Sequence, residues 1–143
     1  MELWRTINVD PENEYADGRW RFMMYDTEYS SGLYEQEFSG AENNSLTRII
    51  ENQPVFASAL RNPDFRKLFM ESLKRIGAEI FAPERVNSTL DQWSSEWLSL
   101  MDDQFKRFGA NEPIWYYNIH IIKKFYAERY KYIISYAEDM LGE

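Results

Sequence analysis

The sequence predicts a mainly α domain with one small β element, in which three long amphipathic helices pack as a bundle or a layer. Apolar residues recur at intervals of three and four over most of residues 45–143, which is the spacing of helices buried along one face. Proline stands at the start of each long apolar stripe, where its fixed φ suits the first helical turn. Residues 1–44 instead hold turn-forming residues and short apolar alternation, which favour strands and loops.

A β-hairpin is expected near the N-terminus. Asp17-Gly18 precedes the run RWRFMMYD, and an Asp-Gly pair before alternating apolar residues is a short-range hairpin signal. The alternation places Trp20, Phe22 and Met24 on one face of a strand, whose partner strand is expected within residues 3–9. Two strands alone are marginally stable, so we expect the hairpin to pack on another element.

Two short helices and one long helix follow. Ser45 is expected to cap a helix that runs through Glu51. Pro54 is expected to open a second helix that ends near Leu60. Asn62-Pro63, a capping residue followed by a first-turn proline, begins the first long helix. Its apolar stripe consists of Phe65, Leu68, Phe69, Leu73, Ile76 and Ile80.

The remaining sequence predicts two more long helices. One begins at Ala82-Pro83-Glu84 and ends at Gly109, a residue that suits the left-handed end of a helix. Asn111–Pro113 opens the last helix. Arg129 falls on the apolar stripe of that helix, so we expect its guanidinium to be paired with a buried carboxylate or with backbone carbonyls.

Aromatic side chains are concentrated in the last two predicted helices. Their helical spacing favours a role in the core, with an exposed remainder available for an interface. The set is Trp93, Trp97, Phe105, Phe108, Trp115, Tyr116, Tyr117, Phe125 and Tyr126.

Composition excludes several classes of function. Among 143 residues, 16 Lys and Arg stand against 24 Asp and Glu, and this net charge of −8 argues against nucleic acid as a partner. With no cysteine there is no disulfide, thiolate metal site or cysteine nucleophile. The single histidine, His120, lies among apolar neighbours and is expected in the core or at its boundary. No run approaches the roughly 20 apolar residues of a membrane-spanning helix.

The segment directly after the predicted strand, YDTEYSSG, holds the best candidate for a functional site. Asp26 and Glu28 are two positions apart around a turn, close enough for both carboxylates to bind one Mg²⁺ ion. The alternative is that Asp26 caps the turn while Glu28 is merely solvated.

Three parts of the sequence together resemble the spore coat protein H (CotH) family. The run GRWRFMMYDTEYSSGLY resembles its strand followed by an acid, and RNPDFRKLFMESLKRIGAEIFAPERVNSTLDQW resembles its N-P-x-F-R-x-x-F helix and F-x-P-E-R-V segment. Trp115 and the segment FYAER at residues 125–129 resemble the W…F-x-x-x-R pattern near the family's end. The resemblance runs from about residue 18 over most of the chain.

The resemblance implies a remote relative of protein kinases, with the helical part corresponding to the C-terminal lobe of an atypical protein-kinase-like fold. Members of the CotH family transfer phosphate from ATP to serine on partner proteins, which are coat proteins in spore formers. Asp26 stands where the family has its metal-binding aspartate, and Glu28 where a second acid is common. The resemblance therefore implies Mg²⁺ or Mn²⁺ bound by Asp26 and Glu28, ATP as cofactor, and a location in the cell envelope, outside the cell or in the spore coat.

The sequence also departs from the family pattern. No glycine-rich loop or phosphate-binding lysine is recognisable, and residues 1–25 match no catalytic motif, so no catalytic residue is assigned. Tyr130 follows Arg129, where the family usually has proline. We therefore expect residues 1–143 to be one domain that is part of a larger CotH-like domain and inactive by itself. The alternative is a non-catalytic module for interactions at a coat or cell surface, since some fungal relatives act as ligands of host cells.

Overall fold

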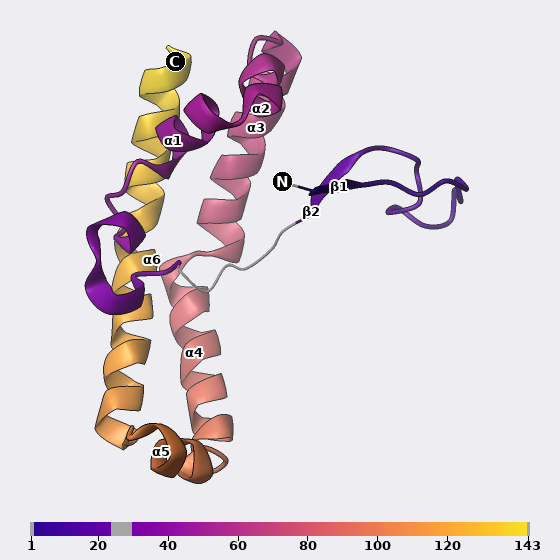
Figure 1. The fold of residues 1–143 in the computed structure, drawn as a ribbon. Coiled ribbons are helices and arrows are strands. Elements are labelled where there is room, and N and C mark those ends of the chain that lie inside the picture. Colours follow the sequence, from indigo (N-terminus) through magenta and orange to yellow (C-terminus); the bar gives the residue numbers. More distant parts are fainter. Residues whose placement is uncertain (1, 24–29, 143) are drawn as a thin grey trace.

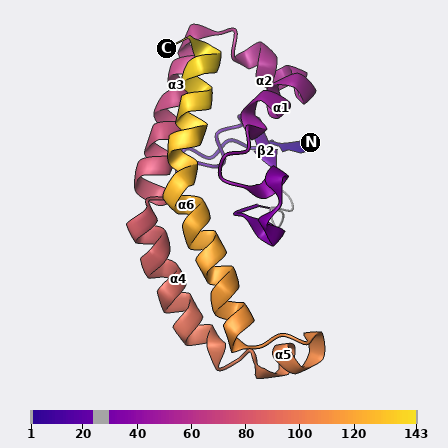
Figure 2. The ribbon, with the colours of Figure 1, turned by 90° about the vertical axis from the view of Figure 1, so that its left-hand side faces the viewer.

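The computed structural model describes residues 2–23 and 30–142 and confirms a mainly α fold with a small two-stranded N-terminal sheet. The longest helix, α6 (Glu112–Leu141), is 30 residues long. The helices α3 (Pro63–Arg75) and α4 (Pro83–Leu98) lie one after the other along α6, so the long helices form an elongated layer (Figures 1 and 2). In the described part of the chain, no helix combines the length and apolar character needed to cross a membrane.

A π-helical turn, η3 (Ile76–Ile80), separates the first two long helices. A Cβ atom on Gly77 would lie 2.2 Å from Cδ2 of Tyr130, so the Tyr130 ring of α6 can approach this turn only where a side chain is absent. Ala82 is extended (φ −54°, ψ 134°), the conformation favoured before proline, and Pro83 starts α4.

The helix predicted from residue 83 to Gly109 is two helices, which corrects the sequence prediction. α4 ends at Leu98 and a short turn leads into α5 (Asp102–Phe108). Asp102 and Asp103 lie in the first turn of α5, where the helix dipole favours acidic side chains. The apolar spacing continues through the turn, so periodicity does not reveal the break. Gly109 ends α5 in the left-handed region (φ 66°), as predicted.

The N-caps of the helices are largely the predicted ones. The side chain of Asn62 accepts hydrogen bonds at the start of α3, and Asn111 Oδ1 accepts from Ile114 N at the start of α6. The exception is α1 (Ser45–Asn52), where Asn44 Oδ1 accepts from Thr47 N (3.1 Å), so that Asn44 rather than Ser45 is the cap.

The core lies at the C-terminal end of α6, where α1, α2 (Pro54–Ala59) and α3 meet it (Figure 2). Leu46, Met70 and Ala137 are its buried centre. Phe56 of α2 contacts Phe69 of α3 edge to face, with ring centroids 5.5 Å apart. The partly buried side chains packed around the centre are Ile50, Phe56, Phe69, Leu73, Ile133, Met140 and Leu141.

The predicted hairpin is formed by β1 (Glu2–Trp4) and β2 (Arg21–Met23), which pair antiparallel. Leu3 is paired with Phe22 in the register, whereas Met24, predicted to share a face with Phe22, lies outside the described residues. The partner strand starts before the expected range, at Glu2. The connection spans residues 5–20, so Asp17-Gly18 lies within a long loop and is not a two-residue turn.

The hairpin lies to one side of the helical layer, which differs from the expectation that it packs on another element (Figure 1). Contacts of Arg21 hold it together instead. Arg21 donates to Asp17 Oδ1 (2.7 Å) and to Glu14 O (2.9 Å), and its guanidinium lies 5.6 Å from the Trp4 ring centroid. This network ties the long connection to the sheet.

Candidate functional site

The two acids predicted to bind a metal ion, Asp26 and Glu28, lie outside the described residues. The described chain resumes at residue 30 with a segment that crosses α6 before α1 begins. We call this segment, residues 30–44, the strap.

The backbone of the strap is left-handed at several residues that are not glycine. Four of its residues have left-handed φ values between 50° and 83°: Ser31, Gly32, Tyr34 and Glu35. Ser39 stabilises this bend, because its backbone carbonyl oxygen accepts a hydrogen bond from Gly32 N (2.9 Å) and its hydroxyl donates to Leu33 O (2.7 Å). Clustered left-handed residues persist only where surrounding contacts determine them, and α6 supplies those contacts.

Arg129 of α6 holds the C-terminal part of the strap. Its Nη1 donates to Ala41 O (2.8 Å) and Asn43 O (2.7 Å), and its Nη2 donates to Ser45 Oγ (2.8 Å). Of the two pairings predicted for this arginine, the one with backbone carbonyls is therefore confirmed. Partial burial lowers the pKa of the guanidinium, because desolvation disfavours its charged form.

Tyrosines of α6 hold other points of the strap. The Ser31 hydroxyl donates to Tyr126 Oη (3.2 Å), and Tyr136 Oη donates to Glu42 O (2.5 Å). Tyr117 Oη donates to the Glu35 carboxylate, and this hydrogen bond raises the pKa of the Tyr117 phenol.

Gly32 allows the strap to approach α6 closely. A Cβ atom on Gly32 would lie 2.9 Å from Cγ2 of Ile121. With φ at 83°, the position also favours glycine for its backbone conformation.

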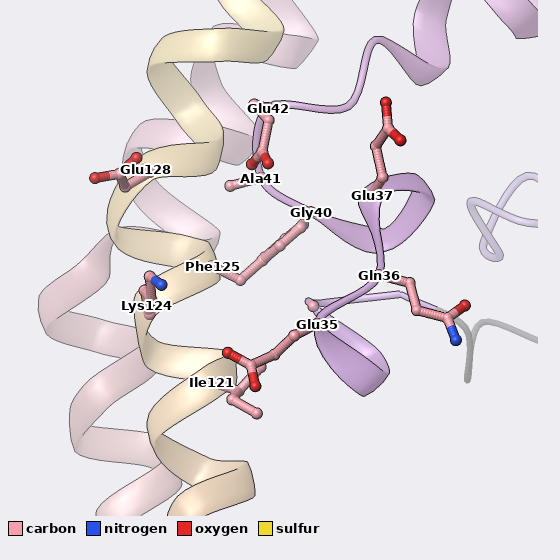
Figure 3. Close-up of a pocket in the computed structure, with 11 residues that line it drawn as sticks. Glu35, Gln36, Glu37, Gly40, Ala41, Glu42, Ile121, Lys124, Phe125 and Glu128 are labelled. Atoms are coloured by element: carbon pink, nitrogen blue, oxygen red, sulfur yellow. The ribbon is translucent and has the colours of Figure 1, made fainter.

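A hollow of about 210 Å³ lies between the strap and α6 (Figure 3). Glu35 extends its carboxylate toward α6, whereas Gln36 and Glu37 point away from the helix, and the Glu42 carboxylate lies back over Gly40. Lys124 is the one basic residue among the lining residues the structure describes, against four glutamates. This negative balance disfavours a phosphate group in the hollow.

Carboxylates at the strap do not form a metal site of their own. Among residues 2–23 and 30–142, no group of three or more histidine, aspartate or glutamate side chains lies close enough to hold a metal ion. The metal-binding prediction therefore depends on Asp26 and Glu28.

A second hollow of about 290 Å³ lies on the side of the strap that faces the π-helical turn. The Phe81 and Tyr126 rings are stacked there, with centroids 5.0 Å apart and planes inclined by 19°. Its lining residues are Ser30, Ser31, Leu73, Ile76, Gly77, Phe81, Phe125, Tyr126, Arg129, Tyr130 and Ile133.

At the other end of α6, aromatic side chains are more exposed than predicted. Trp93 and Trp97 of α4 stack in parallel, with centroids 5.9 Å apart, yet are 49% and 53% exposed. Trp115 is partly buried and donates from Nε1 to the buried Ser94 hydroxyl (2.8 Å). His120 is exposed, which corrects its predicted place in the core or at its boundary.

The sequence predicted that Arg129 needs buried partners, but it did not predict that residues 30–44 form one segment packed on α6. Tyr117, Ile121, Phe125 and Arg129 recur every four residues, so they lie on one face of α6. That period shows a shared face, but it does not show that the face meets a loop from residues 30–44 instead of another helix.

Comparisons with known proteins point to one family. A model described as the CotH kinase protein family matches residues 1–133, starting upstream of residue 18, where the resemblance seen in the sequence begins. Neither the comparison with curated proteins nor the one with solved structures found a match. Because the family match covers most of the 143 residues, the chain belongs to the CotH kinase protein family.

Proposed function

We propose that this chain supplies the metal-binding segment of a protein kinase that transfers phosphate from ATP to serine hydroxyls of a partner protein. The observation that carries the proposal is the family match, which spans the YDTE segment with Asp26 and Glu28. A strand followed by an aspartate that binds magnesium is a recurring part of kinase sites.

The chemistry of the two acids suits Mg²⁺ or Mn²⁺. Carboxylate oxygens are hard ligands, and such ions typically use one or two protein carboxylates and complete their shell with water and phosphate oxygens. Bound there, the ion would neutralise charge on the ATP phosphates. Asp26 and Glu28 would hold the ion. The hydrogen bond from Ser31 to Tyr126 fixes the strap to α6 three residues after Glu28.

We further propose that residues 1–143 do not transfer phosphate by themselves. No glycine-rich loop, phosphate-binding lysine or catalytic aspartate motif is recognisable in the sequence. The hollow beneath the strap does not replace these parts, since its described lining has four glutamates and one lysine.

The second candidate is a non-catalytic module for interactions at a coat or cell surface. The half-exposed Trp93–Trp97 stack favours it, because exposed aromatic side chains are common in protein interfaces. In this case Asp26 would cap a turn.

The experiment compares Asp26→Asn with Asp103→Asn in the full reading frame of the gene. Both variants remove one acidic charge, but Asp103 is exposed on α5, far from the strap in sequence. We expect Asp26→Asn to lower Mn²⁺-dependent transfer of labelled phosphate from ATP to protein on the order of a hundredfold, and Asp103→Asn to leave it unchanged. Equal activity of Asp26→Asn and the parent would contradict the proposal.

A binding measurement separates the two candidates. Kinase function predicts that Mn²⁺ binding, followed by electron paramagnetic resonance, weakens in Asp26→Asn with circular dichroism unchanged. If no variant of the full protein shows ATP turnover, and Asp26→Asn binds Mn²⁺ as the parent does, the interaction module is the better interpretation.

A further inference from the structure

The second hollow is lined by Arg129, whose hydrogen-bond acceptors among the described residues are uncharged. Arg129 lines this hollow and is partly buried, and its described hydrogen-bond acceptors are two carbonyls and one hydroxyl. Among residues 2–23 and 30–142, no carboxylate lies within ion-pair distance of it. The nearby charge of Glu42 does not outweigh desolvation, which lowers the pKa of Arg129, so an anion bound at this guanidinium would stabilise its charge.

Two of the five N–H groups of Arg129 have no acceptor among the described residues. The side chain has five N–H donors, and the described residues accept from Nη1 twice and from Nη2 once. One N–H on Nε and one on Nη2 therefore remain. These two N–H groups can donate to the oxygens of a carboxylate.

The rest of the hollow divides into a polar side and an apolar wall. Ser30 and Ser31 contribute hydroxyls beside Tyr126 Oη. The wall is formed by Leu73, Ile76, Phe81, Phe125 and Ile133. At about 290 Å³, the hollow exceeds the roughly 150 Å³ of a cavity that binds benzene.

We propose that this hollow is a binding site for a monocarboxylate with an aromatic or branched aliphatic tail. The carboxylate would meet the remaining N–H groups of Arg129 and the hydroxyls of Ser31 and Tyr126, while the tail would cover the apolar wall. A single guanidinium neutralises a single negative charge, so a monoanion fits better than a phosphate dianion, whose second charge would be desolvated without a partner. The proposal is argued from described residues alone and does not rest on the proposed kinase function.

The test titrates the 143-residue chain with sodium benzoate and, in parallel, with benzyl alcohol. The two probes have the same ring and nearly the same size, but only benzoate is charged. Ionic strength is kept constant with sodium chloride, and amide shifts are followed by ¹H–¹⁵N correlation spectra. We expect saturable benzoate binding with Kd on the order of 1 mM, centred on residues 30–31 and 126–130. Benzyl alcohol should bind at least about tenfold more weakly.

Three variants locate the site. Arg129→Gln should abolish the preference for benzoate over benzyl alcohol. Since this change also removes anchors of the strap, Tyr126→Phe provides a second test that loses only a hydroxyl and should weaken benzoate binding about threefold to tenfold. Ile76→Phe adds a ring at the wall and should weaken both probes, while Ile114→Phe, on an exposed site of α6, should change neither.

Three outcomes would overturn the proposal. The first is the absence of saturable benzoate binding, and the second is equal binding of the two probes. The third is benzoate binding that stays unchanged in both Tyr126→Phe and Ile76→Phe.

Discussion

The two halves of α6, residues 112–126 and 127–141, both contain aromatic side chains but have different surroundings. Its C-terminal half meets α1, α2, α3 and the end of the strap, and Ala137 there has no exposed surface. Its N-terminal half meets α4 and the first part of the strap, and Tyr116 and Tyr117 there are about half exposed. Burial of a helix is thus decided by how many elements cover it, and composition alone does not predict it.

The largest difference between the halves should appear on truncation of the core. Met70 is 3% exposed, so Met70→Ala should lower the free energy of unfolding by about 2–4 kcal/mol through lost burial and a remaining cavity. Leu68→Ala is the matched control on the same helix, because Leu68 is 60% exposed and its truncation should cost less than about 1 kcal/mol. Urea unfolding measures both, and equal losses would show that the core is not formed as described.

The second largest loss of stability is expected where Gly77 contacts the Tyr130 ring. Gly77→Ala would place a methyl group against the Tyr130 ring and should lower the free energy of unfolding by about 1–3 kcal/mol. A double-mutant cycle tests the cause, since Gly77→Ala should be nearly neutral in a Tyr130→Ala background. If Gly77→Ala lowered the free energy of unfolding equally in that background, the Tyr130 ring would not be the source of the strain.

The exposed half should tolerate the loss of a large aromatic side chain. Trp97→Ala removes one member of the Trp93–Trp97 stack, and because Trp97 is half exposed the free energy of unfolding should fall by only about 0.5–1.5 kcal/mol. Thermal unfolding by circular dichroism provides the measurement. A loss as large as that of Met70→Ala would mean that this end has a core equivalent to the other.

The smallest effect concerns the pH dependence of the strap. The hydrogen bond to Glu35 raises the pKa of Tyr117 above its unfolded value of about 10. The stabilisation is therefore complete below the unfolded pKa and is lost as pH rises through the folded pKa. Compared with Tyr117→Phe, the parent should lose stability more steeply above about pH 10, as measured by urea unfolding from pH 8 to 11. Parallel curves would show that the hydrogen bond is absent in solution.

Much of the fold could be predicted because its determinants are local. Caps such as Asn62 and Asn111, first-turn prolines and the stop at Gly109 act within one helical turn, so their neighbours in sequence reveal them. The break between Leu98 and Asp102 was missed because apolar spacing continues across it.

Features that depend on distant contacts could be predicted only in part. The position of Arg129 on an apolar stripe showed that it needed partners, but not that they are carbonyls of Ala41 and Asn43, more than 80 positions away. The expectation that the hairpin packs on another element was wrong for a related reason. Arg21 instead joins the hairpin to its own connecting loop through hydrogen bonds to Asp17 and Glu14. Asp26 and Glu28 lie outside the described residues, so their role stays a prediction.

The distance along the sequence between the strap and its anchors sets an order of events during synthesis. The hydrogen bonds from Arg129 to the strap and to Ser45 join residues separated by 84 to 88 positions. A ribosome that adds about 5–20 residues per second completes that interval in roughly 4–18 s. Throughout this time the strap has emerged while the helix that fixes it has not. The strap therefore adopts its left-handed bend late, when nearly the whole chain has left the ribosome, and a nascent chain stopped before residue 129 would lack it.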